Sequence, residues 1–219
     1  MKIMFEIGEI LKKKNILIYG FGKTGKSSLN FLKKKNKLTI YDDNHKVIPK
    51  KIKKKYFKKR SKIIKQKFAY ILLSPGININ KCKLKHFIKK NNNKIISDLD
   101  IFYAYAHKNK KITITGTNGK STTSKLLYEI LKKHKKNVRL VGNIGRPVLS
   151  QIPKNSKTIF IIEASSYQIE YSKYFKTDFS AILNISPDHL ERHGNIYNYV
   201  KAKFKLLKNQ KKKWIYIYK

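Results

Sequence analysis

Short runs of apolar residues, rich in isoleucine, alternate along this chain with longer amphipathic stretches. A short apolar run suits a strand that is buried on both faces, and the stretches between the runs show the apolar spacing of helices. The predicted strands are 15–19, 38–41, 68–73, 111–115, 158–162 and 180–183, and the predicted helices are 27–35, 81–91, 99–106, 122–134 and 197–208. Strands that alternate with helices predict an α/β fold with parallel sheets.

The chain has 219 residues, which suits one large domain or two modest ones. A polar, basic stretch at 106–110 precedes a new predicted strand, and we place a domain boundary there. The predicted domains are therefore 1–107 and 108–219. The lysine-rich segment 46–67 also contains Ile, Tyr and Phe, so we interpret it as loop and helix rather than as a disordered segment.

Three observations narrow the class of protein. Cys82 is the single cysteine, so it has no partner for an internal disulfide, which fits a reducing compartment. No apolar run approaches the roughly 18 residues that span a bilayer. The first fifteen residues contain Glu6 and Glu9 and lack the apolar core of a secretory signal. Secreted, disulfide-stapled and membrane-spanning classes are excluded, and a cytoplasmic protein is expected.

The formal charge of +40 arises from 52 Lys and Arg against 12 Asp and Glu. Clustered cations favour nucleic acid, but only Arg60, Arg139, Arg146 and Arg192 are arginines, the residue type that reads bases and clamps phosphates. The lysines are spread along the whole chain, so we interpret them as a solvated surface that attracts anions without specificity. A dedicated nucleic-acid binder is the less favoured alternative. Because acids are scarce, each acid inside a motif is informative.

A glycine-rich segment follows the first predicted strand. Gly20, Gly22 and Gly25 have the spacing of a dinucleotide-binding fingerprint, and Asp42 ends the next strand, where an acid accepts a ribose hydroxyl. Read from Gly20 to Ser27, the segment also has the spacing of a P-loop. Both patterns place backbone N–H groups and a helix N-terminus against a phosphate. An NAD(P)-dependent oxidoreductase and a turn without a ligand stay open as alternatives at this point.

A second glycine-rich segment follows the strand 111–115. It lacks the first glycine of the strict P-loop spacing, but its chemistry is complete. Gly116 and Gly119 let the backbone approach a phosphate, Lys120 supplies a cation, and Ser121 or Thr122 offers a hydroxyl to Mg²⁺. The segment therefore predicts a site for a nucleoside triphosphate.

Glu163 and two histidines lie in further segments and are residue types that can bind a ligand or a metal ion. Glu163 follows the apolar residues 159–162, so its carboxylate should emerge at the carboxyl edge of the sheet, where α/β proteins bind ligands. His189 and His193 have a spacing known from zinc sites, but Glu191 lies at the wrong position for H-E-x-x-H and no third ligand follows. Zinc is not expected.

Segments 142–147, 163–170, 184–194 and 199–203, together with Gly-Thr-Asn-Gly-Lys-Ser-Thr at 116–122, closely resemble the Mur ligases of peptidoglycan synthesis. Ser121 favours the members that add D-glutamate to UDP-N-acetylmuramoyl-L-alanine. The resemblance covers nearly the whole chain in the family's order. It implies a Rossmann-like N-terminal domain for the uridine-nucleotide substrate, followed by the first part of a P-loop-type central domain for ATP. The family's third domain has no counterpart here.

The resemblance also implies a mechanism. ATP phosphorylates the substrate carboxylate to an acyl phosphate, the amine of D-glutamate attacks it, and the tetrahedral intermediate collapses to amide, ADP and phosphate. A triphosphate and a carboxylate repel one another, and Mg²⁺ together with lysine cancels that repulsion. The expected cofactors are ATP and Mg²⁺. The expected protein is a cytoplasmic monomer without a membrane or a specific nucleic-acid partner, acting in cell-wall synthesis and cell division.

Residue roles follow from the resemblance alone. The implied catalytic residues are Lys120, His189 and Lys203. The implied ATP contacts are Gly116, Thr117, Asn118, Gly119, Lys120, Ser121 and Thr122. The implied Mg²⁺ ligands are Ser121, Glu163, His189 and a carbamylated Lys203. The implied substrate contacts are Gly25, Lys26, Ser27, Asp42, Ser74 and Gly76 around the uridine diphosphate, with Asn143, Ser165 and Gln168 elsewhere.

Members of the family continue beyond the counterpart of Lys219, through the rest of the central domain and a third domain. Here the strand-like run 214–218 is the last feature. We therefore expect little or no ligase activity from these 219 residues alone. A nucleotide-binding module without catalysis and another Mur or folylpolyglutamate-type ligase stay open as alternatives.

Overall fold

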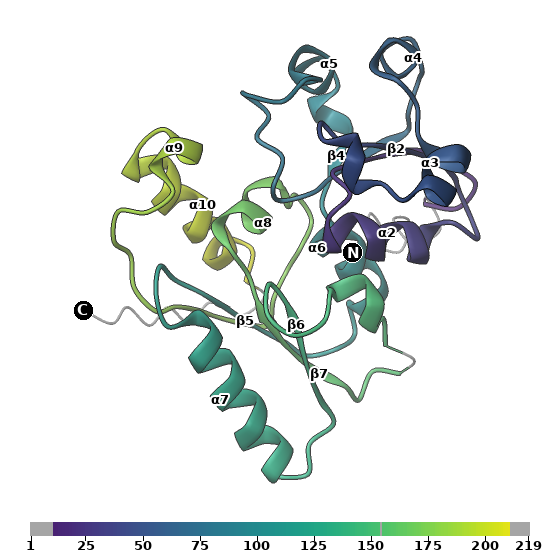
Figure 1. Cartoon of the computed structure of the whole chain (residues 1–219). Coiled ribbons are helices and arrows are strands. Elements are labelled where there is room, and N and C mark those ends of the chain that lie inside the picture. The colour runs from purple at the N-terminus through teal and green to yellow at the C-terminus, as the bar shows by residue number, and fades with distance from the viewer. Residues whose placement is uncertain (1–10, 154, 211–219) are drawn as a thin grey trace. The chain divides into compact units, whose positions relative to one another are not determined.

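The computed structural model describes residues 11–153 and 155–210, which form two compact units, one ending at Ala104 and the other beginning at Tyr105. Each unit contains a four-stranded parallel sheet with helices (Figure 1). The α/β fold predicted from the sequence is confirmed. The assignment of 1–107 to a uridine-nucleotide substrate and of 108–219 to ATP stays a prediction.

In the first unit the strand order is β2-β1-β3-β4. The strands are β1 (Asn15–Tyr19), β2 (Lys37–Tyr41), β3 (Tyr70–Leu73) and β4 (Ile95–Ile96). The helices are α2 (Lys23–Leu32), α3 (Lys50–Tyr56), α4 (Arg60–Ile64), α5 (Lys85–Lys90) and α6 (Asp98–Ala106), with 3₁₀ turns η1 (His45–Val47) and η2 (Asn92–Lys94). The last two residues of α6 belong to the second unit. The central strand β1 is fully buried from Ile16 to Tyr19, as expected of an apolar run in a parallel sheet.

The helix expected at 27–35 begins earlier, because α2 starts at Lys23, directly after Gly22. The third glycine of the fingerprint, Gly25, therefore lies inside the helix rather than in the loop. The helix expected at 81–91 is shorter in the structure, where α5 covers only Lys85–Lys90. The lysine-rich segment 46–67 forms α3 and α4 with connecting loops, as the sequence indicated.

In the second unit the strand order is β6-β7-β5-β8. The strands are β5 (Lys111–Thr115), β6 (Val138–Gly142), β7 (Ile159–Glu163) and β8 (Phe179–Ile182). The helices are α7 (Lys120–Lys133), α8 (Ser166–Tyr171), α9 (Leu190–His193) and α10 (Ile196–Lys208), with a 3₁₀ turn η3 (Val148–Gln151). Because every strand pair is parallel, the segments that follow β5, β6, β7 and β8 emerge at one edge.

The sequence did not predict β4, β6, α8 or α9. The strand β6 reads Val-Arg-Leu-Val-Gly, and its charged residue obscures the apolar run. The strand-like run 214–218 lies outside the described residues. No helix within 11–153 or 155–210 is long and apolar enough to cross a membrane.

A buried lysine fixes the start of β5. Lys111 is inaccessible to solvent, and its Nζ donates to the carbonyl oxygen of Ala106 at 2.9 Å and to that of Asn109. Its Nζ also lies 3.5 Å from Oδ2 of Asp178. A cation at the carbonyl end of a helix is favourable, so Lys111 stabilises the end of α6 and holds β5 in place.

Two acids in the first turn of α6 differ in their surroundings. Asp100 accepts hydrogen bonds from the backbone N–H and the hydroxyl of Ser97, at 2.9 and 3.0 Å. Asp98 is 3% exposed and accepts from the N–H of Leu99 at 3.0 Å. Burial raises the pKa of the Asp98 carboxyl from its ordinary 3.8 to about 6. Ionised Asp98 therefore destabilises the folded chain at neutral pH.

Substituting Asp98→Asn should increase the free energy of unfolding by about 2 kcal/mol at pH 7, and much less at pH 4. Between about pH 4 and pH 6 the folded chain binds more protons at Asp98 than the unfolded chain, so stability falls as the pH rises through this window. The measurement is urea unfolding at both pH values. Asp100→Asn is the matched control and should destabilise the chain, because it weakens two hydrogen bonds. Equal changes in the free energy of unfolding for the two variants would contradict the raised pKa of Asp98.

Candidate nucleotide and metal site

The loop 116–119 connects β5 to α7 at the carboxyl edge of the second sheet. Within the described part of the chain no side chain caps α7, and Gly119 occupies its N-cap position. The N–H groups of the first turn therefore lack intrahelical partners, which makes this end of the helix suited to an anion. Ser121 and Thr122 lie in that turn with exposed side chains.

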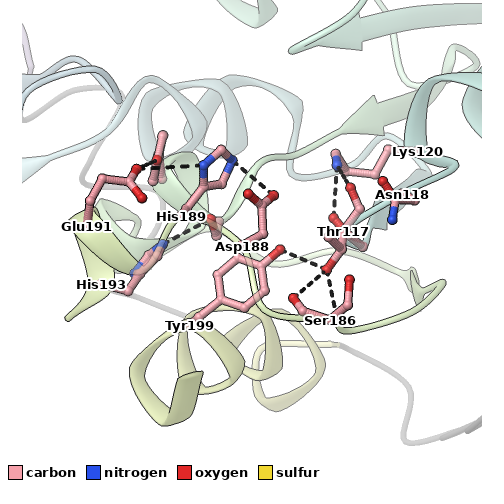
Figure 2. A network of polar contacts seen from close by, with 12 residues as sticks. Thr117, Asn118, Lys120, Ser186, Asp188, His189, Glu191, His193 and Tyr199 are labelled. Carbon is pink, nitrogen blue, oxygen red and sulfur yellow. Dashed lines mark hydrogen bonds and ion pairs between the residues drawn. The ribbon is translucent and has the colours of Figure 1, made fainter. Parts of the chain in front are cut away.

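Lys120 folds back over the same loop. Its Nζ donates to the carbonyl oxygen of Gly116 at 2.9 Å and to that of Thr117 at 2.6 Å (Figure 2). The ammonium group thus lies at the loop that would hold a phosphate, as the sequence pattern requires of a P-loop lysine.

A second lysine reaches the same carbonyl oxygen from α10. Lys203 is 1% exposed, and its Nζ donates to the carbonyl oxygen of Gly116 at 2.7 Å. The ammonium also lies 4.5 Å from the ring centre of Tyr199, one helical turn earlier. Burial, and to a smaller extent the charge of Lys120, lowers the pKa of Lys203 to about 8. Its unprotonated, nucleophilic fraction at neutral pH is therefore larger than that of an ordinary lysine.

The hydroxyl of Thr117 joins the loop to two other segments. Its Oγ1 accepts the N–H of Ser186 at 3.0 Å, lies 3.2 Å from the Ser186 carbonyl oxygen, and lies 3.0 Å from the hydroxyl of Tyr199 (Figure 2). Residues 184–186, which follow β8, thus run beside the loop. The structure brings Thr117, Asn118, Lys120 and Lys203 together, although the sequence pattern alone placed Lys203 on a solvated helix.

Glu163 ends β7 and is inaccessible to solvent. Its Oε1 accepts from the side-chain amide of Asn143 at 2.8 Å, and the N–H of Asn143 donates to the Glu163 carbonyl oxygen at 2.9 Å. Its Oε2 is buried and has no hydrogen-bond partner among the residues that the structure describes. A buried carboxylate oxygen without a partner is costly unless a cation binds it, so this donor fits a hard metal ion.

The two histidines of α9 and its N-cap have different partners. His189, at φ 55°, is exposed, and its ring nitrogens lie 3.4 Å from Asp188 Oδ2 and 3.9 Å from Glu191 Oε1 (Figure 2). His193 is 7% exposed, and its Nε2 lies 3.0 Å from the hydroxyl of Ser166. Burial lowers the pKa of His193. His193 therefore ties α9 to α8, whereas His189 is accessible to a ligand.

Among residues 11–153 and 155–210 no three or more His, Cys, Asp or Glu side chains gather as a metal site. That finding does not address a site built also from hydroxyl and lysine groups. The ligand set Ser121, Glu163, His189 and carbamylated Lys203 stays a prediction.

Ser165 and Gln168 have a structural role that the sequence interpretation missed. The Ser165 hydroxyl accepts the N–H of Gln168, and the Gln168 side chain accepts the N–H of Ser165 at 3.1 Å, forming a capping box at the start of α8. The signal was available, because Ser-x-x-Gln before a helix is the sequence pattern of this cap. Their role as substrate contacts stays a prediction.

The glycine loop of the first unit is held by its own side chains. Asp42 accepts the N–H of Phe21 at 2.7 Å and that of Asn44 at 2.8 Å. The Ser74 hydroxyl donates to the carbonyl oxygen of Gly20 at 2.8 Å. Both residues were expected to contact a uridine diphosphate; the structure shows that they also shape the loop.

The remaining expected contacts lie around the first turns of α2 and after β3. Lys26 and Gly76 are exposed. The hydroxyl of Ser27 is buried and makes no hydrogen bond within the described residues. α2 has no side-chain cap there either, so its N-terminus also suits an anion. The contacts of Lys26, Ser27 and Gly76 with a uridine diphosphate stay a prediction.

Comparison with known families shows which family the chain belongs to. The family model described as "Mur ligase MurD-like, N-terminal domain" matches residues 14–97. The family model described as "Mur ligase middle domain" matches residues 114–219. The chain belongs to the Mur ligase family. The family resemblance predicted from the sequence is therefore confirmed.

Curated relatives of this Mur ligase chain agree with the assignment. The chain is 36% identical to UDP-N-acetylmuramoylalanine--D-glutamate ligase of Caldicellulosiruptor bescii over 209 residues, covering 91% of this chain and 46% of the relative. It is 39% identical to the protein of the same name from Rickettsia bellii over 200 residues, covering 90% of this chain and 44% of the relative. The chain thus spans less than half the length of these relatives.

A solved structure shows the same fold. UDP-N-acetylmuramate:L-alanyl-gamma-D-glutamyl-meso-diaminopimelate ligase from Neisseria meningitides superposes with a TM-score of 0.55 at 16% identity. The match covers 90% of this Mur ligase chain and 68% of that chain. At this identity the likeness supports the fold of the chain and does not bear on its substrate.

Proposed function

We propose that this chain provides the nucleotide sites of a ligase that joins D-glutamate to UDP-N-acetylmuramoyl-L-alanine at the expense of ATP. The names of the curated relatives support this substrate pair. The observation that carries the proposal is the loop 116–119, where Lys120 lies against the uncapped start of α7. This arrangement is suited to a triphosphate.

The second sheet also offers groups for Mg²⁺. The hydroxyl of Ser121 and the partnerless Oε2 of Glu163 would hold one ion, and His189 with carbamylated Lys203 would hold another. When bound, Mg²⁺ would neutralise phosphate charge as the substrate carboxylate attacks. The lowered pKa of Lys203 supports carbamylation, because the unprotonated amine is the form that reacts with carbon dioxide.

In the first unit we assign the uridine diphosphate to the start of α2. The open helix end and the unsatisfied hydroxyl of Ser27 are donors for a diphosphate, and Asp42 and Ser74 hold the loop that faces it. Lys26 and Gly76 would complete this contact. Gly25 would contribute by its missing side chain, which lets the start of α2 approach the backbone of Gly20.

We propose a monomer acting in the cytoplasm during cell-wall synthesis and cell division, without a membrane or nucleic-acid partner. The free, buried Cys82 is compatible with a reducing compartment. Size-exclusion chromatography with light scattering tests the monomer.

Calorimetric titration tests the nucleotide sites. We expect the 219-residue chain to bind both Mg-ATP and UDP-N-acetylmuramoyl-L-alanine. Lys120→Ala should weaken Mg-ATP at least about tenfold while leaving the uridine ligand unchanged, because one charge-assisted contact to phosphate is lost. Lys125→Ala, an exposed lysine of the same helix, is the matched control. Unchanged ATP affinity in Lys120→Ala would refute the ATP site, and preference for NAD(H) over the uridine ligand would favour an oxidoreductase.

A further inference from the structure

Asn184 follows β8 and has an exposed side chain, yet it makes several hydrogen bonds to the loop 116–119. Its Oδ1 accepts the N–H of Asn118 at 2.8 Å and that of Thr117 at 3.1 Å. Its Nδ2 donates to the carbonyl oxygen of Asn118 at 3.2 Å. We propose that Asn184 is a positioning residue of the phosphate-binding loop, which fixes the direction of the loop's peptide groups before nucleotide binds.

Two peptide groups of the loop are held at both ends. In a trans peptide the N–H and the carbonyl point in opposite directions. The carbonyls of Gly116 and Thr117 face the ammonium of Lys120. The N–H groups of the same two peptides, those of Thr117 and Asn118, face Asn184. Lysine on one side and the amide on the other therefore oppose a rotation of either peptide plane.

The two restraints do not persist together. When the ammonium of Lys120 turns to a phosphate, it leaves the carbonyls of Gly116 and Thr117, of which, among the described residues, only that of Gly116 keeps a lysine donor, Lys203. Asn184 still holds the N–H groups of Thr117 and Asn118, and the N–H groups of the first turn of α7 stay open for a phosphate. A loop held in this way does not have to be ordered on binding, so the affinity for phosphate is higher.

The role of Asn184 is separable from that of the neighbouring main chain. The N–H of Thr117 also lies 3.1 Å from the main-chain carbonyl oxygen of Asn184, a contact that any residue would keep. The N–H of Asn118 contacts only the side-chain oxygen of Asn184 in the bonds described above. Truncation of this side chain therefore acts first on the peptide between Thr117 and Asn118.

This inference rests on the proposed ATP site and has its own test. Asn184→Ala should weaken Mg-ATP binding about tenfold. The N–H of Asn118 loses its hydrogen bond to the side chain, and the N–H of Thr117 loses one of its two acceptors. Thermal stability should change little because the side chain is exposed. In a double-mutant cycle with Lys120→Ala the two losses should not add: without nucleotide both residues hold the same peptides, so Asn184→Ala should cost more once Lys120 is gone. Asn155→Ala is the matched control, because Asn155 also accepts a backbone N–H, that of Lys157, in an exposed loop.

Amide hydrogen exchange measured without nucleotide gives a second readout. The Asn118 amide should exchange at least about fivefold faster in Asn184→Ala than in the parent chain. Asn184→Asp keeps the accepting oxygens, so it should retain the slow exchange. Unchanged or tighter ATP binding by Asn184→Ala, additive losses in the cycle, or unaltered exchange would each overturn the inference. If the parent chain does not bind Mg-ATP or Lys120→Ala has no effect, the proposed function fails instead.

Discussion

Gly142→Ala should unfold the second unit at temperatures where the parent chain is folded. Gly142 ends β6 with φ +109°, and a Cβ built there would lie 2.2 Å from the carbonyl oxygen of Glu163. The partner is backbone of the adjacent strand β7, directly opposite in the register, so no side chain can move to relieve the overlap. We expect a loss of more than about 3 kcal/mol. Thermal unfolding and hydrogen exchange of peptides from β5 to β8 measure it.

Gly194→Ala is the control for the backbone angle alone. Gly194 has φ +83°, but a Cβ there would meet no other heavy atom within 4 Å among the residues that the structure describes. We expect a loss of about 1 kcal/mol from the left-handed conformation. Equal losses in the two variants would show that the contact with Glu163 is not the cause.

Gly142→Ala should also abolish Mg-ATP binding under conditions where some folded protein remains. Asn143, the next residue, bonds both the side chain and the main chain of Glu163. Any displacement of β6 from β7 therefore moves the carboxylate that we assign to Mg²⁺. Normal Mg-ATP affinity in the folded fraction would contradict this link.

Gly25→Ala should unfold the first unit by a different mechanism. A Cβ on Gly25 would lie 2.0 Å from the carbonyl oxygen of Gly20 and 3.0 Å from its carbonyl carbon. Gly25 lies in α2 and Gly20 directly after β1, so the missing side chain lets the helix start against the strand end. Overlap with backbone at this distance should cost more than about 3 kcal/mol. Hydrogen exchange of peptides from β1 to β3 should report loss of protection.

Gly22→Ala is the control for Gly25→Ala, because it also replaces a glycine near the start of α2 but creates no overlap with backbone that the structure describes. A Cβ on Gly22 would meet no heavy atom within 4 Å in the described part of the chain. We expect Gly22→Ala to remain folded, with a change below about 1 kcal/mol. Equal destabilisation by the two variants would refute the close approach of Gly25 to Gly20.

Sequence patterns were sufficient for the parts of the molecule that local chemistry determines. β1 and β5 have the predicted bounds, because β1 is a short apolar run and β5 alternates isoleucine with the β-branched residue threonine. Glu163 lies at the predicted carboxyl edge because strand direction is fixed in a parallel sheet. The family was also accessible, since its motifs are short and occur in a fixed order.

Contacts between distant segments were not accessible from local patterns. Asn184 and Asn118 are 66 positions apart, and Asn143 and Glu163 are 20 positions apart. Nothing in either local sequence indicates the pairing, which follows from the strand order. The burial of Lys203 was hidden for the same reason, because one lysine among many becomes distinct only when α10 packs against α8 and the loop.

The strand order of the second unit affects how the chain folds as it is synthesised. β5 pairs with β7 and β8, and β6 pairs with β7, so neither β5 nor β6 has a neighbour until residues 159–163 leave the ribosome. In the first unit β1 pairs with the next strand along the chain, β2, whose residues lie 22 positions later. Nascent chains that end before β7 therefore expose two unpaired strands, which is a state prone to aggregation and to capture by chaperones.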